Sequence, residues 1–201
     1  MAASQWWPAG CVSRTHDATN DAMVHVRLDD CTGPFGLRHH TGDITVVFSA
    51  NSDGTLHASA ESSGMTVNGH PVSYQRDSDI TLDDAHHTRT IHSTGAWTRV
   101  DDEGETVAHT SDVTTVVDLE ADTRTTNGTA QTSVGSRDIT STISGYEVRR
   151  GLAGEGCPSG TVTHERSASG DTVTIAFNGT NEAELTGPKG RSIEVPLVCG
   201  L

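Results

Sequence analysis

The stretch TRTIHSTGAWTRVDDEGETVAHTSDVTTVVDLE, residues 88–120, decides the fold. The acidic segment 101–104 divides it into two halves of similar length. In the second half, apolar side chains recur on alternate positions, at Val113, Val117 and Leu119. Apolar alternation on both sides of a glycine-containing turn is typical of antiparallel strands that bury one face. The stretch therefore predicts a hairpin of two long strands.

The same alternation extends over most of the chain. Residues 24–28, 44–48 and 193–197 each place apolar side chains on one parity. The Asn-Gly pairs at 68–69, 127–128 and 178–179 are hairpin signals. Roughly a dozen strands in hairpin order predict an all-β antiparallel meander. An extended or curved sheet, a sandwich and an open barrel are all compatible with this pattern.

One glycine-rich stretch, 151–160, has the composition of a linker. We therefore divide the chain into a long-stranded antiparallel β region, 1–150, and a C-terminal β subregion, 151–201. The alternative is one continuous domain.

Composition indicates an ordered but thin core. Leu, Ile, Val and Phe account for 37 of the 201 residues, about 18%, and the net charge is −14. That combination is typical of disorder, but the alternating pattern and the abundance of valine and threonine favour strands. A surface this acidic repels phosphate backbones and anionic membranes, so we expect no nucleic-acid partner.

The four cysteines are widely spaced and form no CxxC motif, which excludes zinc-ribbon and thioredoxin-type sites. Three disulfide pairings are possible. We favour Cys11–Cys31 and Cys157–Cys199, because each would tie one end of the chain to a nearby strand. Disulfides predict an exported protein, secreted, periplasmic or on the cell surface. Four buried free thiols in a cytosolic protein are the alternative.

The N-terminal residues contain no basic region followed by an apolar run. We therefore expect the sequence to represent a mature chain without a membrane span.

Two regions carry a family resemblance. They are residues 30–44 (DCTGPFGLRHHTGDI), followed by MTVNG at 65–69, and CPSGTVT at 157–163, continuing through TIAFNGT at 174–180 to Cys199. Together they resemble uncharacterised exported or lipoprotein-type β-sheet proteins of Gram-negative bacteria. The resemblance implies an all-β fold and an exported location, and it implies no activity or catalytic residue.

Histidine is the main candidate for chemistry, with eleven residues. Imidazole and carboxylate groups from neighbouring strands suit zinc or copper(II). No compact ligand motif such as HExxH occurs, so solvated surface histidines are the alternative. The candidate metal ligands are His39, His40, His86, His87 and His92.

Calcium is a second possible ion. The acidic runs at 77–79 and 101–105 supply carboxylate oxygens on expected loops, but neither has the spacing of an EF-hand. Solvated turns explain both runs equally well.

The sequence favours a non-catalytic protein. It contains no GxSxG nucleophile elbow and no glycine-rich nucleotide loop. Trp6, Trp7 and Trp97 either mark a ligand surface or fill the thin core. We expect a secreted or cell-envelope protein that acts in binding or as a structural, self-assembling surface component, pairing through sheet edges or with another surface protein. A metal-binding protein and an enzyme of unrecognised type are the alternatives.

Overall fold

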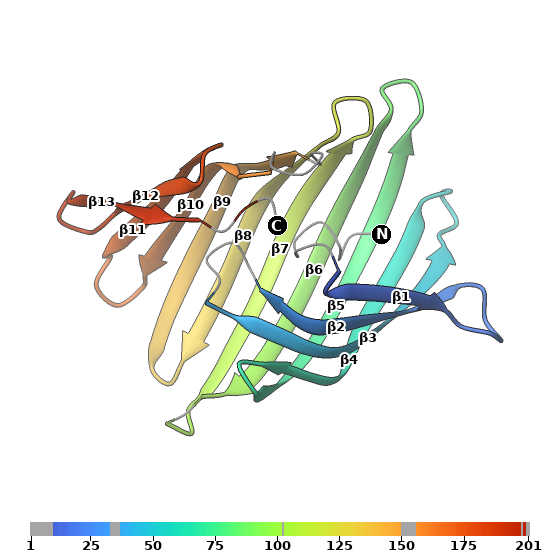
Figure 1. Ribbon diagram of the computed structural model, residues 1–201, viewed down its shortest axis with the longest axis horizontal. Coiled ribbons are helices and arrows are strands. Elements are labelled where there is room, and N and C mark those ends of the chain that lie inside the picture. Colours follow the sequence, from blue (N-terminus) through green and yellow to red (C-terminus); the bar gives the residue numbers. More distant parts are fainter. Residues whose placement is uncertain (1–9, 33–36, 102, 150–155, 198, 200–201) are drawn as a thin grey trace.

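The computed structural model describes residues 10–32, 37–101, 103–149, 156–197 and 199 (Figure 1). They form a single open sheet in which each strand pairs antiparallel with its neighbour in the chain. The predicted all-β antiparallel meander is therefore confirmed. The strands are β1 (Val12–His16), β2 (Met23–Thr32), β3 (His39–Ala50), β4 (Leu56–Val67), β5 (His70–Asp83), β6 (Thr88–Val100), β7 (Thr106–Asp118), β8 (Thr123–Val134), β9 (Arg137–Arg149), β10 (Ser159–Arg166), β11 (Thr172–Asn178), β12 (Glu182–Thr186) and β13 (Ser192–Pro196).

The centre of the sheet is regular. β5, β6 and β7 pair without a shift in register along their whole contact. Along most of β5, exposed and less exposed residues alternate strictly, as expected where only one face is shielded from solvent. We call the face that carries Val72, Ile91 and Val107 the inner face, and the opposite one the outer face.

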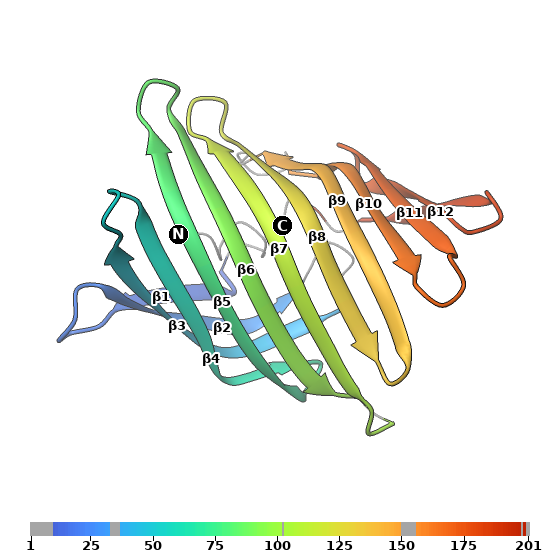
Figure 2. The same cartoon turned by 180° about the vertical axis from the view of Figure 1, so that it is seen from behind.

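The flanks of the sheet bend because their register is interrupted. Shifts occur in the pairs β2–β3, β3–β4, β4–β5, β8–β9 and β9–β10. A β-bulge bends its strand and increases the local twist. Figures 1 and 2 show β1–β3 lying across one side of the long central strands, so that the sheet curls over its inner face.

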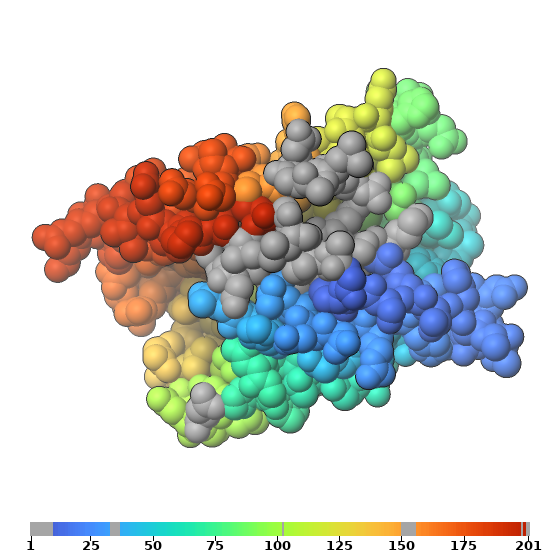
Figure 3. Space-filling model, in the orientation of Figure 1, coloured from blue at the N-terminus to red at the C-terminus, as the bar shows by residue number. Residues whose placement is uncertain are grey.

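Two clusters of buried side chains lie where the sheet curls. In the first, Val26 and Leu28 of β2 pack with Met65 of β4 and Val72 of β5. In the second, Tyr146 of β9 meets Phe177 of β11 edge to face, with ring centroids 5.3 Å apart. Figure 3 shows the N-terminal and C-terminal strands as two separate masses, in blue and in orange to red.

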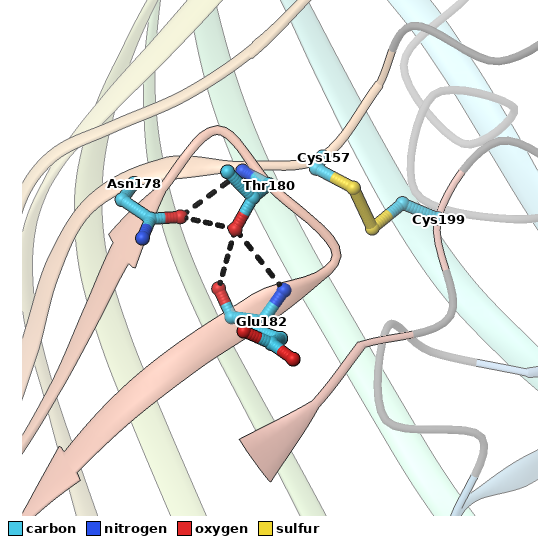
Figure 4. The surroundings of a disulfide bond; sticks show 5 residues. All are labelled: Cys157, Asn178, Thr180, Glu182 and Cys199. Atoms are coloured by element: carbon cyan, nitrogen blue, oxygen red, sulfur yellow. Dashed lines mark hydrogen bonds between the residues drawn. A yellow bond between two sulfur atoms is a disulfide. The ribbon is translucent and has the colours of Figure 1, made fainter. Parts of the chain in front are cut away.

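Both predicted disulfides are present. Cys11–Cys31 joins the residue before β1 to β2, and Cys157–Cys199 joins the segment before β10 to the chain beyond β13. Figure 4 shows the second bond beside the turn after β11, where Thr180 donates from its N–H and Oγ1 to Asn178 Oδ1 over 3.1 and 2.6 Å. The Asn-Gly signal at 178–179 is thus a turn, as expected.

The expectation of a turn at Asn127-Gly128 is wrong. Both residues lie inside β8, and Gly128 sits at a β-bulge with a φ of 149°. The long partner strand β7 continues past this point, so the chain bulges instead of reversing. Asn127 uses its side chain there to accept the N–H of Gly145 over 2.7 Å.

The sheet continues from β9 to β10 by direct pairing. The proposed domain boundary near residue 151 falls on residues 150–155, outside the described part of the chain, as do Trp6 and Trp7. Among the described residues, no helix has the length and apolar character needed to cross a membrane.

Removing the disulfides should destabilise the fold in the order of their loop lengths. Cys11–Cys31 spans 20 residues and Cys157–Cys199 spans 42. Loop-closure entropy then predicts that the free energy of unfolding falls by about 3 kcal/mol when Cys11 and Cys31 are both changed to serine. It predicts a fall of about 4 kcal/mol when Cys157 and Cys199 are both changed. Urea denaturation of each double variant measures these losses. Unchanged stability in both variants would contradict a structural role for the bonds.

Gly128→Ala should destabilise the protein more than Gly104→Ala. A Cβ at Gly128 would lie 2.6 Å from Val113 Cα on β7, whereas one at Gly104 meets nothing within 4 Å. Both residues have positive φ, so both variants bear that strain. We expect the free energy of unfolding to fall by about 3 kcal/mol or more in Gly128→Ala and by about 1 kcal/mol in Gly104→Ala. Thermal and urea denaturation compare the two, and equal losses would show that β8 relaxes away from β7.

Candidate ligand-binding pocket

Charges on the central strands are separated by face. Paired residues of antiparallel strands project to the same side, so the register assigns each side chain to a face. From β5 to β8, every arginine projects to the inner face and every aspartate to the outer face. The arginines are Arg76, Arg89, Arg99 and Arg124, and the aspartates are Asp77, Asp79, Asp83, Asp112 and Asp118.

The outer-face aspartates pair with histidines in several places. His57 Nδ1 lies 3.0 Å from Asp79 Oδ1, and His92 Nε2 lies 2.8 Å from Asp112 Oδ1. Hydrogen bonding from His57, and then from Asn51, lowers the pKa of Asp79. These pairs are solvent-exposed and contribute little to stability individually.

A pocket of about 290 Å³ opens on the inner face beside the β4–β5 hairpin. We call it the hairpin pocket. The register brings its side chains together, because His40 pairs with Val67, Val67 with His70, and Tyr74 with Trp97. Its lining residues are Arg38, His40, Met65, Val67, Asn68, His70, Val72, Tyr74, Trp97 and Arg99.

The aromatic wall of the pocket is held from the β7 side. The Trp97 indole stacks on the His109 ring, with centroids 5.0 Å apart and an interplanar angle of 16°. His109 Nδ1 in turn lies 2.8 Å from Thr132 Oγ1 on β8. Burial, with a smaller contribution from Arg38, lowers the pKa of His109, so this ring is neutral at neutral pH. A stacked, hydrogen-bonded neighbour fixes the orientation of the indole.

Asn68 holds the segment that carries Arg38. Its Nδ2 donates to Leu37 O over 3.2 Å, and its Oδ1 accepts the N–H of His39 over 2.7 Å. The Asn68 N–H also donates to His39 O over 2.8 Å. The backbone on both sides of Arg38 is therefore bound to the β4–β5 turn, and this places the Arg38 side chain at the pocket.

Two arginines line the pocket, Arg38, which is exposed, and Arg99, which is half-buried. Arg137 contacts Glu105 over 3.3 Å, and Arg27 lies 3.9 Å from Asp43. For Arg38 and Arg99, the described part of the chain provides no carboxylate partner within salt-bridge distance. The ten lining residues in the described part of the chain include these two arginines and no Asp or Glu.

His40 is the most strongly perturbed histidine among the described residues. Burial lowers its pKa to about 4, with smaller contributions from the nearby charges of Arg38 and His39. The ring is therefore neutral at neutral pH and adds polarity, not charge, to the pocket. Burial also lowers the pKa of His164, on β10.

The structure places the five predicted metal ligands at separate points. His39 and His40 are consecutive on β3 and project to opposite faces. His39 Nδ1 lies 2.7 Å from Asp30 Oδ1, and His86 Nδ1 lies 2.7 Å from Asp83 Oδ2. His87 lies in the β5–β6 turn with a φ of 50°, and His92 lies on the outer face of β6. Binding of zinc or copper by these residues stays a prediction.

Among the described residues, one group of three has the spacing for a metal ion. It consists of Asp101, Glu103 and Glu105, in the β6–β7 turn, with ligand atoms within 4.8 Å of one another. Asp101 Oδ1 already accepts the backbone N–H groups of Glu103 and Glu105 over 3.0 and 2.9 Å. This group falls on one of the two acidic runs considered for calcium, and calcium binding there stays a prediction.

Sequence reasoning missed most of the pocket. It singled out His40 as a metal ligand and Trp97 as either a ligand contact or a core residue, and it did not select Arg38, Tyr74 or Arg99. A signal was present in β6, where Arg89 and Arg99 share the parity of Ile91 and Trp97. An arginine on the apolar parity of a strand marks a charge directed toward the shielded face.

In comparisons with known proteins, no family model, no curated protein and no solved structure matches this chain.

The stability of the protein should fall as the pH drops from about 6.5 to about 4. In this interval His40 gains a proton in the unfolded protein but stays neutral in the folded protein. Unfolded histidine titrates near pH 6.5, and folded His40 at about 4. The unfolded state thus binds the extra proton between these values, and the free energy of unfolding decreases from about pH 6.5 down to about pH 4. Allowing for partial solvent exposure, His40 accounts for about 1–2 kcal/mol of this decrease.

The variant His40→Gln isolates this contribution, because His109 and His164 remain in both proteins. Urea denaturation at about pH 7 and about pH 4.5 should show a smaller difference for the variant than for the wild type. Identical pH dependence would mean that His40 is protonated freely in the folded protein.

Proposed function

We propose that the protein is an exported, non-catalytic binding protein whose ligand occupies the hairpin pocket. The observation that carries this proposal is the composition of the pocket, which is lined by apolar and aromatic side chains together with two arginines. Small-molecule sites in proteins are concave and largely apolar, with a few polar groups that fix the ligand. At about 290 Å³, the hairpin pocket is near the lower end of their usual range.

The lining favours binding over catalysis. Its ten described residues include no Asp, Glu, Ser, Thr or Cys, which are the side chains that most often act as nucleophiles or carboxylate bases. Its histidine on β3, His40, has a pKa lowered to about 4, well below the range suited to acid–base exchange at neutral pH.

Export is supported by the two disulfides, which persist in oxidising compartments. The resemblance to exported or lipoprotein-type β-sheet proteins agrees with this location. We therefore place the protein outside the cytoplasm, as a secreted, periplasmic or cell-surface component.

Ligand binding is a better-supported function than self-assembly through sheet edges. The edge strands β1 and β13 have five residues each, and β13 ends at Pro196. Short edges and proline limit the addition of further strands. The inner face offers a formed pocket, whereas the edges offer only short rows of backbone groups.

Methionine methyl NMR should detect ligand binding at the pocket. Met65 lines the pocket and is 9% exposed, whereas Met23 lies on the outer face of β2. In protein labelled with ¹³C at the methionine methyl groups, we expect phenylacetate, phenylacetamide or phenethylamine to shift the Met65 signal saturably. The Met23 signal should stay in place. Met65→Leu and Met23→Leu assign the two signals.

Two outcomes would contradict the proposal. In one, no probe of any charge shifts the Met65 signal. In the other, the Met23 and Met65 signals move together, which would indicate a general change of the protein and not occupation of the pocket.

A further inference from the structure

We infer that the hairpin pocket binds a small organic monocarboxylate, with the carboxylate between Arg38 and Arg99 and the apolar body against Met65, Val72 and the rings of Tyr74 and Trp97. This inference rests on the proposed binding function and names the class of ligand. It depends on the charge, shape and support of the pocket.

The charge of the pocket calls for an anion. Arg38 and Arg99 line it, and the described lining residues include no carboxylate. Arg38 is exposed and Arg99 is half-buried, so both guanidinium groups are accessible to a ligand in the pocket. A guanidinium presents its N–H groups in a planar fork that matches a carboxylate, so each arginine is able to donate two parallel hydrogen bonds.

The size and lining of the pocket call for a small ligand with an apolar body. A cavity of about 150 Å³ accommodates benzene. At about 290 Å³, the hairpin pocket has room for one ring and a short acidic side chain. Val67 and Val72 extend the apolar wall formed by Met65 and the two aromatic rings.

The charge of the whole chain favours a singly charged ligand. At a net charge of −14, the protein repels an approaching anion in proportion to the charge of that anion. A monocarboxylate meets the smallest repulsion, and salt screens it within about 8–10 Å. Polyanions are disfavoured on the same ground, whereas a small monoanion reaches the arginines on the inner face.

Asn68 acts as a positioning residue for this site. Its side chain binds the backbone on both sides of Arg38 and so holds that guanidinium over the pocket. Asn68 has a φ of 53°, which glycine adopts readily. Asn68→Gly therefore keeps the turn while it removes both side-chain hydrogen bonds. It should weaken carboxylate binding more than amide binding.

Phenylacetate and phenylacetamide test the inference directly, because they share shape and differ in charge. Titration followed by the Met65 methyl signal and by calorimetry should show phenylacetate binding at least about tenfold more tightly. Arg38→Gln and Arg99→Gln should each remove most of this difference. Arg99→Lys should retain part of it, since lysine keeps the charge but lacks the fork. Raising the salt concentration should weaken phenylacetate binding and not amide binding.

Arg27→Gln is the matched control. Arg27 lies on the outer face of β2, where its guanidinium is 3.9 Å from Asp43, and its removal should change phenylacetate affinity by less than about twofold. Unchanged melting temperatures and an unchanged Met65 signal in the free variants confirm that the pocket remains folded. Equal weakening by Arg27→Gln and Arg99→Gln would overturn the inference, because the effect would then follow net charge alone.

The remaining outcomes separate this inference from the proposed function. If phenylacetamide binds as tightly as phenylacetate, the carboxylate assignment fails and the binding function stands. If phenyl phosphate binds more than about tenfold more tightly than phenylacetate, the site selects a phosphate ester and the carboxylate assignment also fails. If no probe shifts Met65, the binding function itself fails.

Discussion

A sheet must shield its apolar face from water, and in the described part of this chain it does so by curling on itself. This constraint governs the whole molecule. The register is regular through β5–β7 and is interrupted on both flanks, in β2–β5 and in β8–β10. Curling brings Val26 of β2 into the same cluster as Val72 of β5. The hairpin pocket lies at this curl, where Tyr74 and Trp97 extend beyond the packed cluster.

The sequence predicts the strands well because alternation and turn chemistry are local. Residues 88–100 form β6 as expected, and both disulfide pairings, which tie each end of the chain to a nearby strand, are confirmed. The bulge at Gly128 escapes such reasoning, since Asn-Gly also marks a turn. The pocket escapes it as well, because its formation requires that β3 curl toward β6, and no local pattern specifies that approach.

Net charge describes this protein poorly when it is taken as one number. The carboxylates of the central strands lie on the outer face and in the turns. The inner face of β5–β8 carries arginines and no aspartate or glutamate. Burial lowers the pKa of Arg124 to about 10, which still leaves this guanidinium protonated at neutral pH. Repulsion of polyanions at long range and the proposed binding of a small anion at short range are therefore compatible in one sheet.

The linear strand order has a consequence for how the chain acquires its structure. Each strand pairs only with the strands immediately before and after it, so no segment waits for a distant partner. Pairing between neighbours keeps sequence separations short, and topologies of this kind fold faster than sheets with long crossovers. The sheet is able to grow one hairpin at a time, as arrays of repeats do. Cys11–Cys31 then closes the β1–β2 hairpin, and Cys157–Cys199 links the two ends of the four-strand segment β10–β13.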